Sequence, residues 1–202
     1  MKVVAVHEII SCGAYPRSKH WRTTKAEILE AIRACDWPPG SGSFTIYPQS
    51  GKKSGEGNGV KPIRDKFVAH LRDRGWVIEG AAQNALGQGL GDFDAVTEGP
   101  DGPVVVEWET GNISSSHRSM NKLTMLVSCG AIAAGVLVVP SRALYVYLTD
   151  RIGNIKEPEP YFALWKSVPC KKGVLEIVVI EHDATSESVP KIPKGTDGRA
   201  LR

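Results

Sequence analysis

Several features that define particular classes of protein are missing from this 202-residue sequence. Its four cysteines (Cys12, Cys35, Cys129, Cys170) form no CxxC pair and no histidine stands at zinc-finger spacing, which argues against a zinc finger or a disulfide-stapled domain. No apolar run approaches the length of a membrane-spanning helix, and the opening residues MKVVAVHEII are too mixed in polarity for a signal peptide. These absences predict a cytoplasmic protein with free thiols and no membrane association.

The composition is that of an ordinary globular protein, with 42% hydrophobic and 23% charged residues. The formal net charge of +3 is compatible with a nucleic-acid partner but does not require one, because many enzymes share this balance. The length suits one compact domain, and neither an internal repeat nor a Pro/Gly-rich linker divides the chain. We therefore expect a single domain over residues 1–202.

Hydrophobic periodicity predicts helices that alternate with strands along the chain. The expected helices cover residues 24–35, 61–74, 115–128 and 141–148, and the expected strands cover residues 43–47, 76–78, 93–97, 104–108, 135–139 and 175–180. Thr24 with Glu27 makes a capping box for the first helix, and Ser114 or Ser115 caps the third. This order predicts an α/β fold with a mixed central β-sheet flanked by helices.

Three carboxylates stand out near the middle of the sequence. Glu107 and Glu109 are two residues apart in an extended segment, so their side chains project from the same side. The turn sequence GPDGP before them predicts a hairpin that lays Asp94 alongside. Asp94 and Glu107 then suit Mg²⁺, which prefers oxygen ligands, and Glu109 is placed to take a proton from an attacking water.

Two other interpretations of these carboxylates are open on spacing alone. Paired acids beside a hairpin are most often a solvated strand edge, although the apolar run Val104-Val105-Val106 indicates a buried strand here. A glycosidase also uses two paired carboxylates, as its acid and its nucleophile. Asp92, two residues before Asp94, competes with it for the place beside the hairpin.

The string EWETGNISSSHRSMNKL, residues 107–123, resembles the active-site strand and following helix of type II restriction endonucleases of the BamHI kind. Three further segments match in the same order: SFTIYP with NGVKPI, YLTDRIGNIKEPEPYF, and VPKIPKGTDGRA. The resemblance covers most of the chain, and residues 80–90 are the part that it does not align well. It implies the PD-(D/E)xK nuclease fold.

The resemblance also implies roles for the acidic cluster. Asp94 and Glu107 would hold Mg²⁺, with Mn²⁺ as a substitute, and the Trp108 backbone carbonyl would complete the shell. Glu79 is the best match to a further acidic metal ligand, although an ordinary surface acid is the alternative for it. Glu109 stands where most of the superfamily has a lysine and would act as the base. No organic cofactor is implied.

The substrate implied by the resemblance is double-stranded DNA, cut at GGATCC or a closely related palindrome to leave 5′ overhangs. A palindrome is read most simply by a homodimer. The matched DNA-contacting residues are Arg64, Asn112, Ser114, Arg118, Asp150 and Arg151. Arginine pairs with guanine, asparagine with adenine, and an acid accepts from cytosine, so the residue types fit base reading. A relative that binds DNA without cutting it is the alternative.

Overall fold

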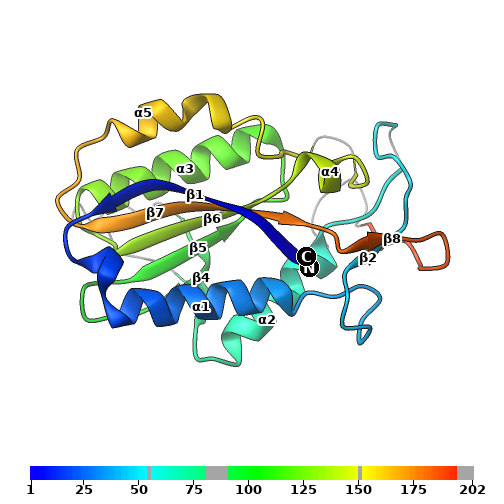
Figure 1. Cartoon of the computed structure of the whole chain (residues 1–202), viewed down its shortest axis with the longest axis horizontal. Helices are drawn as coiled ribbons and strands as arrows, with labels where there is room; N and C mark the ends of the chain where they lie inside the picture. The colour runs from blue at the N-terminus through cyan, green and yellow to red at the C-terminus, as the bar shows by residue number, and fades with distance from the viewer. Residues whose placement is uncertain (54–55, 81–90, 150–151, 195–202) are drawn as a thin grey trace.

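The computed structural model describes residues 1–53, 56–80, 91–149 and 152–194, and its centre is a six-stranded β-sheet in the order β1-β7-β6-β5-β4-β3 (Figure 1). The strands of this sheet are β1 (Lys2–Cys12), β3 (Val77–Gly80), β4 (Phe93–Thr97), β5 (Val104–Trp108), β6 (Ala134–Pro140) and β7 (Gly173–Glu181). The three strands β5, β6 and β7 run parallel, and the remaining pairs are antiparallel. The predicted mixed sheet is confirmed.

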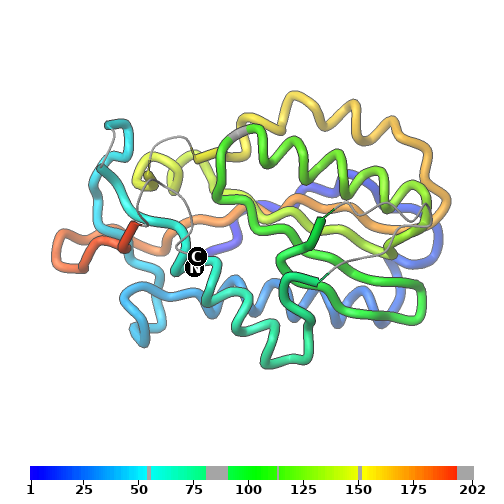
Figure 2. The backbone as a smooth tube through the Cα atoms, turned by 180° about the vertical axis from the view of Figure 1, so that it is seen from behind, coloured from blue at the N-terminus to red at the C-terminus, as the bar shows by residue number. Residues whose placement is uncertain are grey.

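Helices cover both faces of the sheet. One layer contains α1 (Lys19–Arg33) and α2 (Lys61–Arg72), and the other contains α3 (Ile113–Ser128) and α5 (Phe162–Lys166), as Figures 1 and 2 show from opposite sides. The short helix α4 (Arg142–Tyr145) follows β6. The remaining elements are the 3-10 helices η1 (Tyr15–Arg17) and η2 (Glu159–Tyr161) and the two-stranded sheet of β2 (Thr45–Ile46) with β8 (Ala184–Thr185).

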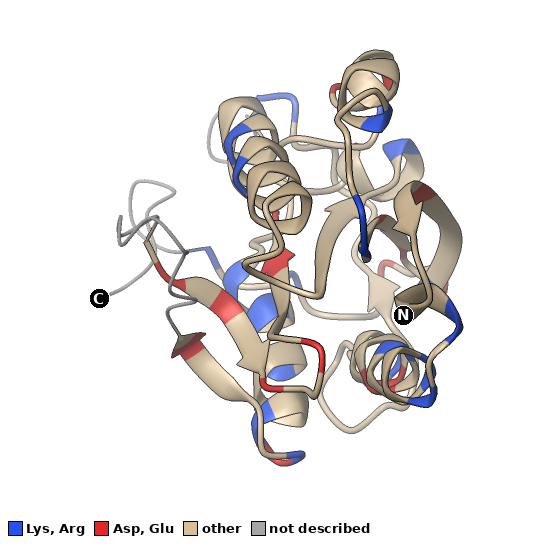
Figure 3. Ribbon diagram, turned by 90° about the vertical axis from the view of Figure 1, so that its left-hand side faces the viewer, with Lys and Arg blue, Asp and Glu red and all other residues tan. Residues whose placement is uncertain are grey.

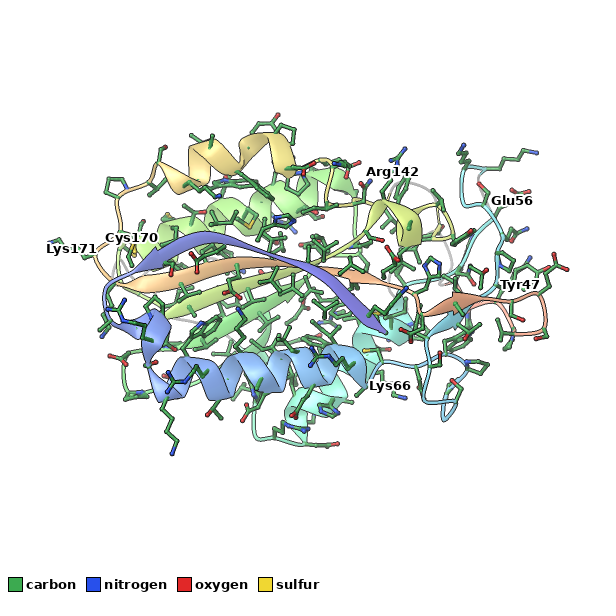
Figure 4. All side chains as sticks on the ribbon, in the orientation of Figure 1. Tyr47, Glu56, Lys66, Arg142, Cys170 and Lys171 are labelled. Carbon is green, nitrogen blue, oxygen red and sulfur yellow. The ribbon has the colours of Figure 1, made fainter. Side chains whose placement is uncertain are left out.

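The helices pack on the sheet through two apolar cores, one on each face, and side chains fill the space between the layers (Figure 4). Val104 and Val106 of β5 point into the core under α1 and α2, while Val105 points into the core under α3. This alternation along a fully buried strand directs Glu107 and Glu109 toward α3. Among the described residues, no helix combines the length and apolar character that a membrane span requires.

Two helix starts differ from the predictions. Helix α1 begins at Lys19, where the Ser18 hydroxyl accepts the Trp21 N–H, so the predicted start at Thr24 is wrong; Thr24 is a buried residue inside the helix. Helix α3 is capped by Asn112, whose side chain accepts the Ser115 N–H, and neither Ser114 nor Ser115 is the cap. In both cases an earlier polar side chain reaches the free N–H groups of the first turn.

The ends of the sheet and of β6 also differ from the predictions. Strand β1 was not predicted, because an edge strand with one face partly exposed mixes apolar and polar residues; it pairs antiparallel with β7. The helix predicted over residues 141–148 is only the single turn of α4, capped by Ser141. Helix α5 was likewise not predicted, since its five residues give too short an apolar pattern.

Candidate active site

The first carboxylate of the predicted cluster, Asp94, lies on β4 and is held by two donors. Its Oδ1 accepts a hydrogen bond from Arg64 Nε at 2.7 Å, and its Oδ2 accepts the backbone N–H of Trp108 at 2.6 Å. The predicted hairpin therefore places Asp94 directly against the end of β5. Asp92 is exposed and offers its backbone carbonyl to the cluster, so the contacts favour Asp94 as its acidic member.

Glu107 is buried at the end of β5 and is paired with a lysine of α3. Lys122 Nζ lies 2.8 Å from Glu107 Oε1, and the two side chains are only 12% and 11% exposed. Burial raises the pKa of Glu107, while the hydrogen bond and charge of Lys122 oppose this shift. The neighbouring negative charge of Asp94 also raises the pKa of Glu107, so the two carboxylates lie close enough to interact.

Glu109 follows β5 and faces the same helix. Its Oε1 accepts a hydrogen bond from the Ser119 hydroxyl at 2.7 Å. Burial raises the pKa of Glu109 to about 7, and the negative charges of Glu107 and Asp94 add to the rise. The Ser119 hydrogen bond and the positive charge of Arg118 act in the opposite direction. A carboxylate whose pKa lies near neutrality is suited to exchange protons during a reaction.

Helix α3 thus supplies one partner each to Glu107 and Glu109. Ser119 and Lys122 are three residues apart, so they lie on one face of the helix, and Glu107 and Glu109 are two apart on one face of the strand. In Figure 3 the acidic positions on neighbouring strands lie beside basic positions on the flanking helices. Sequence reasoning missed Ser119 and Lys122, although a helix start soon after the acid pair made such contacts possible.

Glu79 lies opposite Asp94 in the antiparallel pair of β3 and β4, between the registered pairs Ile78–Ala95 and Gly80–Phe93. Its side chain is 70% exposed and reaches Arg64 at 3.4 Å, the same arginine that binds Asp94. Its backbone has φ 53°, a left-handed conformation that non-glycine residues rarely adopt. Glu79 is therefore connected to the cluster through Arg64, and its side chain lies at the surface.

The carboxylates of this site could bind a magnesium ion, although they do not form a complete coordination shell by themselves. Among the described residues, no three His, Cys, Asp or Glu side chains gather closely enough to enclose a metal. Magnesium, however, is commonly bound by one or two carboxylates, with water and phosphate oxygens completing the shell. Asp94 and Glu107, joined across adjacent strands through the Trp108 backbone, provide two such carboxylates.

The predicted DNA-contacting residues fall into two groups. Asn112, Ser114 and Arg118 are all exposed at the start of α3, close to Glu109 in the chain. Asp150 and Arg151 lie outside the described residues. The segment that follows them returns to the site, because Ile152 forms a bridge with Asn112 and the Gly153 N–H donates to the Gly111 carbonyl.

Asn58 is a buried polar residue that sequence reasoning did not single out. Its side-chain Nδ2 donates to the carbonyls of Tyr47 and Tyr147, both at 2.9 Å, and its Oδ1 accepts the Ile192 N–H. These partners are distant in sequence, so Asn58 joins three loop segments at the end of the molecule where Figure 4 labels Tyr47 and Glu56. At Gly59 a Cβ atom would lie 1.9 Å from the Pro193 carbonyl oxygen, so the close packing requires glycine there.

Comparisons with known proteins agree with this site and fold. The family model described as restriction endonuclease BamHI matches residues 1–199. The chain is 43% identical to the type II restriction enzyme OkrAI of Oceanobacter kriegii over 202 residues, 100% of both chains. It is 34% identical to the type II restriction enzyme BamHI of Bacillus amyloliquefaciens over 183 residues, 87% of this chain and 82% of that enzyme.

A solved structure shares the fold at low sequence identity. The crystal structure of the restriction endonuclease BglII complexed with a DNA 16-mer matches 91% of this chain and 79% of that chain, with a TM-score of 0.60 and 10% identity. The expected restriction-endonuclease fold is thereby confirmed. Together with the match over nearly the whole sequence, this shows that the chain belongs to the BamHI family of type II restriction endonucleases.

Proposed function

We propose that this enzyme cuts both strands of double-stranded DNA at a palindrome, GGATCC, leaves 5′ overhangs, and depends on Mg²⁺. The observation that carries the proposal is the approach of Asp94, held by Arg64 of α2 and the Trp108 N–H, to Glu107 and Glu109, whose side chains contact α3. A protein that only binds DNA has no use for two largely buried carboxylates, Glu107 and Glu109, whose pKa values are raised by burial and by neighbouring acids. The proposed target sequence rests on the sequence segments that resemble the BamHI family, quoted above.

Asp94 and Glu107 would hold the Mg²⁺ ion, with the Trp108 carbonyl and Glu79 as further ligands. When bound there, the ion offsets the negative charge that builds on the phosphate and makes a water more acidic. The strained backbone of Glu79 supports a functional place for it, since such conformations cluster at active sites. Mn²⁺ would serve as a substitute, because it also accepts carboxylate ligands.

Glu109 would act as the general base. A water would attack the phosphorus atom while its proton passes to Glu109. The bond from phosphorus to the 3′ oxygen breaks, and that oxygen takes a proton from a second water to leave as the 3′ hydroxyl. Ser119 fixes the orientation of the Glu109 carboxylate through its hydrogen bond at 2.7 Å. Arg64, already beside Asp94, would also stand close to the scissile phosphate and contribute to its binding.

Base reading would come from the start of α3 and from Asp150–Arg151. Asn112 uses its side-chain oxygen to cap the helix, which leaves its amide nitrogen available for a base edge. Ser114 and Arg118 are exposed on the same helix start. The N-terminus of α3 carries the positive end of the helix dipole, which favours a nearby phosphate.

A homodimer would present two such sites to the two halves of the palindrome. Support for a subunit contact comes from the exposed apolar side chains of Met125 on α3, Tyr161 on η2 and Leu164 on α5. These elements lie together on one side of the sheet (Figure 1). Exposed apolar residues gathered in one region are typical of a protein interface. A DNA substrate would suit a cytoplasmic location.

Digestion of plasmid DNA with and without Mg²⁺, followed by sequencing of the cut ends, tests this proposal. Discrete fragments that begin at GGATCC only when Mg²⁺ is present are the expected result. Cuts at another palindrome would overturn the assigned target and leave the proposed chemistry in place. Folded protein that binds duplex DNA without cutting it in either Mg²⁺ or Mn²⁺ would support the alternative, a family member that binds DNA but does not cleave it.

A further inference from the structure

We propose that Lys122 is a positioning residue of the active site: its ammonium holds the Glu107 carboxylate in the orientation in which that carboxylate binds the divalent cation. The inference rests on the proposed function and assigns a role to a residue outside the acidic cluster and the DNA-contacting set. It begins from the 2.8 Å contact between Lys122 Nζ and Glu107 Oε1.

Lys122 is fixed by three separate contacts. Besides Glu107, its ammonium donates to the Asp92 carbonyl at 3.0 Å and lies 3.6 Å from the centre of the Phe93 ring. A lysine at a protein surface usually moves freely, but a carboxylate, a carbonyl and an aromatic face together define one position for this ammonium. The same contacts tie α3 to the beginning of β4 and to the end of β5, the two strands that carry the acidic cluster.

Burial makes this pair different from an exposed ion pair. Neither side chain exceeds 12% exposure, so water screens the attraction weakly and either charge alone would be costly to bury. Lys122 therefore balances the charge of Glu107 and donates one of its hydrogen bonds, while the Asp94 backbone supplies another. Among the described residues, Lys122 is the partner from α3 that turns the Glu107 carboxylate to its present position.

The distribution of cations over the three carboxylates supports a specific role. Asp94 is paired with Arg64 and Glu107 with Lys122, whereas Glu109 receives a neutral hydroxyl from Ser119. The two carboxylates proposed to bind metal are thus the two with fixed basic partners, and within the described part of the chain the proposed base has no basic side chain in direct contact. Partners that orient metal ligands commonly change metal affinity by roughly 10–100-fold when they are removed.

The test measures Mn²⁺ binding to DNA-free protein from the electron paramagnetic resonance signal of free Mn²⁺, so it does not depend on the recognition sequence. Lys122→Met removes the charge and the donor, Lys122→Gln keeps a donor without charge, and Lys122→Arg keeps both. We expect the Mn²⁺ dissociation constant to rise about tenfold or more in the first two variants and to return toward the wild-type value in Lys122→Arg.

A matched control is Lys25→Met. Lys25 of α1 lies 2.7 Å from Glu176 of β7, a pair of the same chemistry on the other face of the sheet. This variant should lose stability but retain the wild-type Mn²⁺ dissociation constant. Thermal unfolding of every variant shows whether it folds, and Lys122→Gln serves if Lys122→Met does not.

The outcomes separate this inference from the proposed function. A Lys122→Met or Lys122→Gln protein that binds Mn²⁺ within twofold of wild type overturns the inference, even if the wild type cuts DNA. Tighter Mn²⁺ binding would also overturn it, because Lys122 would then be a competitor of the metal. If the wild type cuts no DNA, the proposed function fails, and the Mn²⁺ constants still decide the role of Lys122.

Discussion

The Ser119 hydroxyl donates a hydrogen bond to Glu109 Oε1 at 2.7 Å, and this contact joins helix α3 to the carboxylate proposed as the base. Glu109 is largely buried, and burial raises its pKa to about 7. The hydrogen bond stabilises the ionised form and so limits the rise. Ser119 therefore influences the fraction of Glu109 that is ionised, and so able to accept a proton, at neutral pH.

Ser119→Ala should shift the pH dependence of DNA cleavage to higher pH. Loss of the hydrogen bond raises the pKa of Glu109 further, so a smaller fraction is ionised at pH 7 and the rate there falls, by about fivefold if the pKa rises from about 7 by one unit. Single-turnover cleavage rates between pH 5.5 and 9 measure the shift. Ser128→Ala, at a hydroxyl near the far end of α3, is the control. An unchanged profile for Ser119→Ala would refute the link to Glu109.

Glu109→Gln should stabilise the metal-free protein at alkaline pH. The folded protein retains the Glu109 proton up to about pH 7, while an unfolded chain loses it near the ordinary value of 4.5, so stability falls as pH rises through that window. Glutamine removes this cost. Thermal unfolding in a chelator should give a melting temperature about 3 °C or more above wild type at pH 8, and a similar one at pH 4. A melting temperature of Glu109→Gln below that of wild type at pH 8 would contradict the claim that burial destabilises the ionised Glu109 carboxylate.

Asp94 and Asp92 should differ sharply in their effect on cleavage. Asp94 is bound by Arg64 and the Trp108 amide, whereas Asp92 is exposed and contributes only its backbone carbonyl to the cluster. Asp94→Ala should abolish cutting, and Asp92→Ala should stay within a few-fold of wild type. Cleavage of a duplex at saturating Mg²⁺ compares them. A dead Asp92→Ala with an active Asp94→Ala would exchange the two assignments.

Asn58→Ala should destabilise the protein by about 3 kcal/mol, because it leaves the buried Ile192 N–H without its partner and removes one of two hydrogen bonds from each of the Tyr47 and Tyr147 carbonyls. Urea unfolding at pH 7 gives the free energy of unfolding. Asn121→Ala is the comparison: its exposed side chain accepts one hydrogen bond from Trp165, and we expect a loss of about 1 kcal/mol. Equal losses of unfolding free energy in both variants would argue against the claim that Asn58 holds the loop segments together.

The sequence predicted the centre of the fold well and its margins poorly. The strands at residues 93–97 and 104–108 match β4 and β5 because a hairpin turn separates two clear apolar runs. Strand β1 escaped prediction because it lies at the sheet edge, where neither strict alternation nor a continuous apolar run is required. The start of α1 was misplaced since Ser18 and Thr24 are both acceptable caps, and only packing against the sheet chooses between them.

In the site, the sequence indicated the acids but could not identify their partners. Asp94, Glu107 and Glu109 follow from strand alternation and one turn, which are local patterns. The contacts of Arg64 with Asp94 and of Lys122 with Glu107 join residues 30 and 15 positions apart, and they depend on how α2 and α3 settle against the sheet. Such side-chain pairs require the tertiary structure, so the helical residues that control the acids became visible only there.

The central claim is that Asp94, Glu107 and Glu109 form one Mg²⁺-dependent centre for phosphodiester cleavage. The most direct test compares single-turnover cleavage of a GGATCC duplex by wild type and by Asp94→Asn, Glu107→Gln and Glu109→Gln, with duplex binding measured separately in Ca²⁺. We predict that each variant folds and binds the duplex but cuts it at least about a thousandfold more slowly. Wild-type cleavage rates in any one of the three would contradict the account.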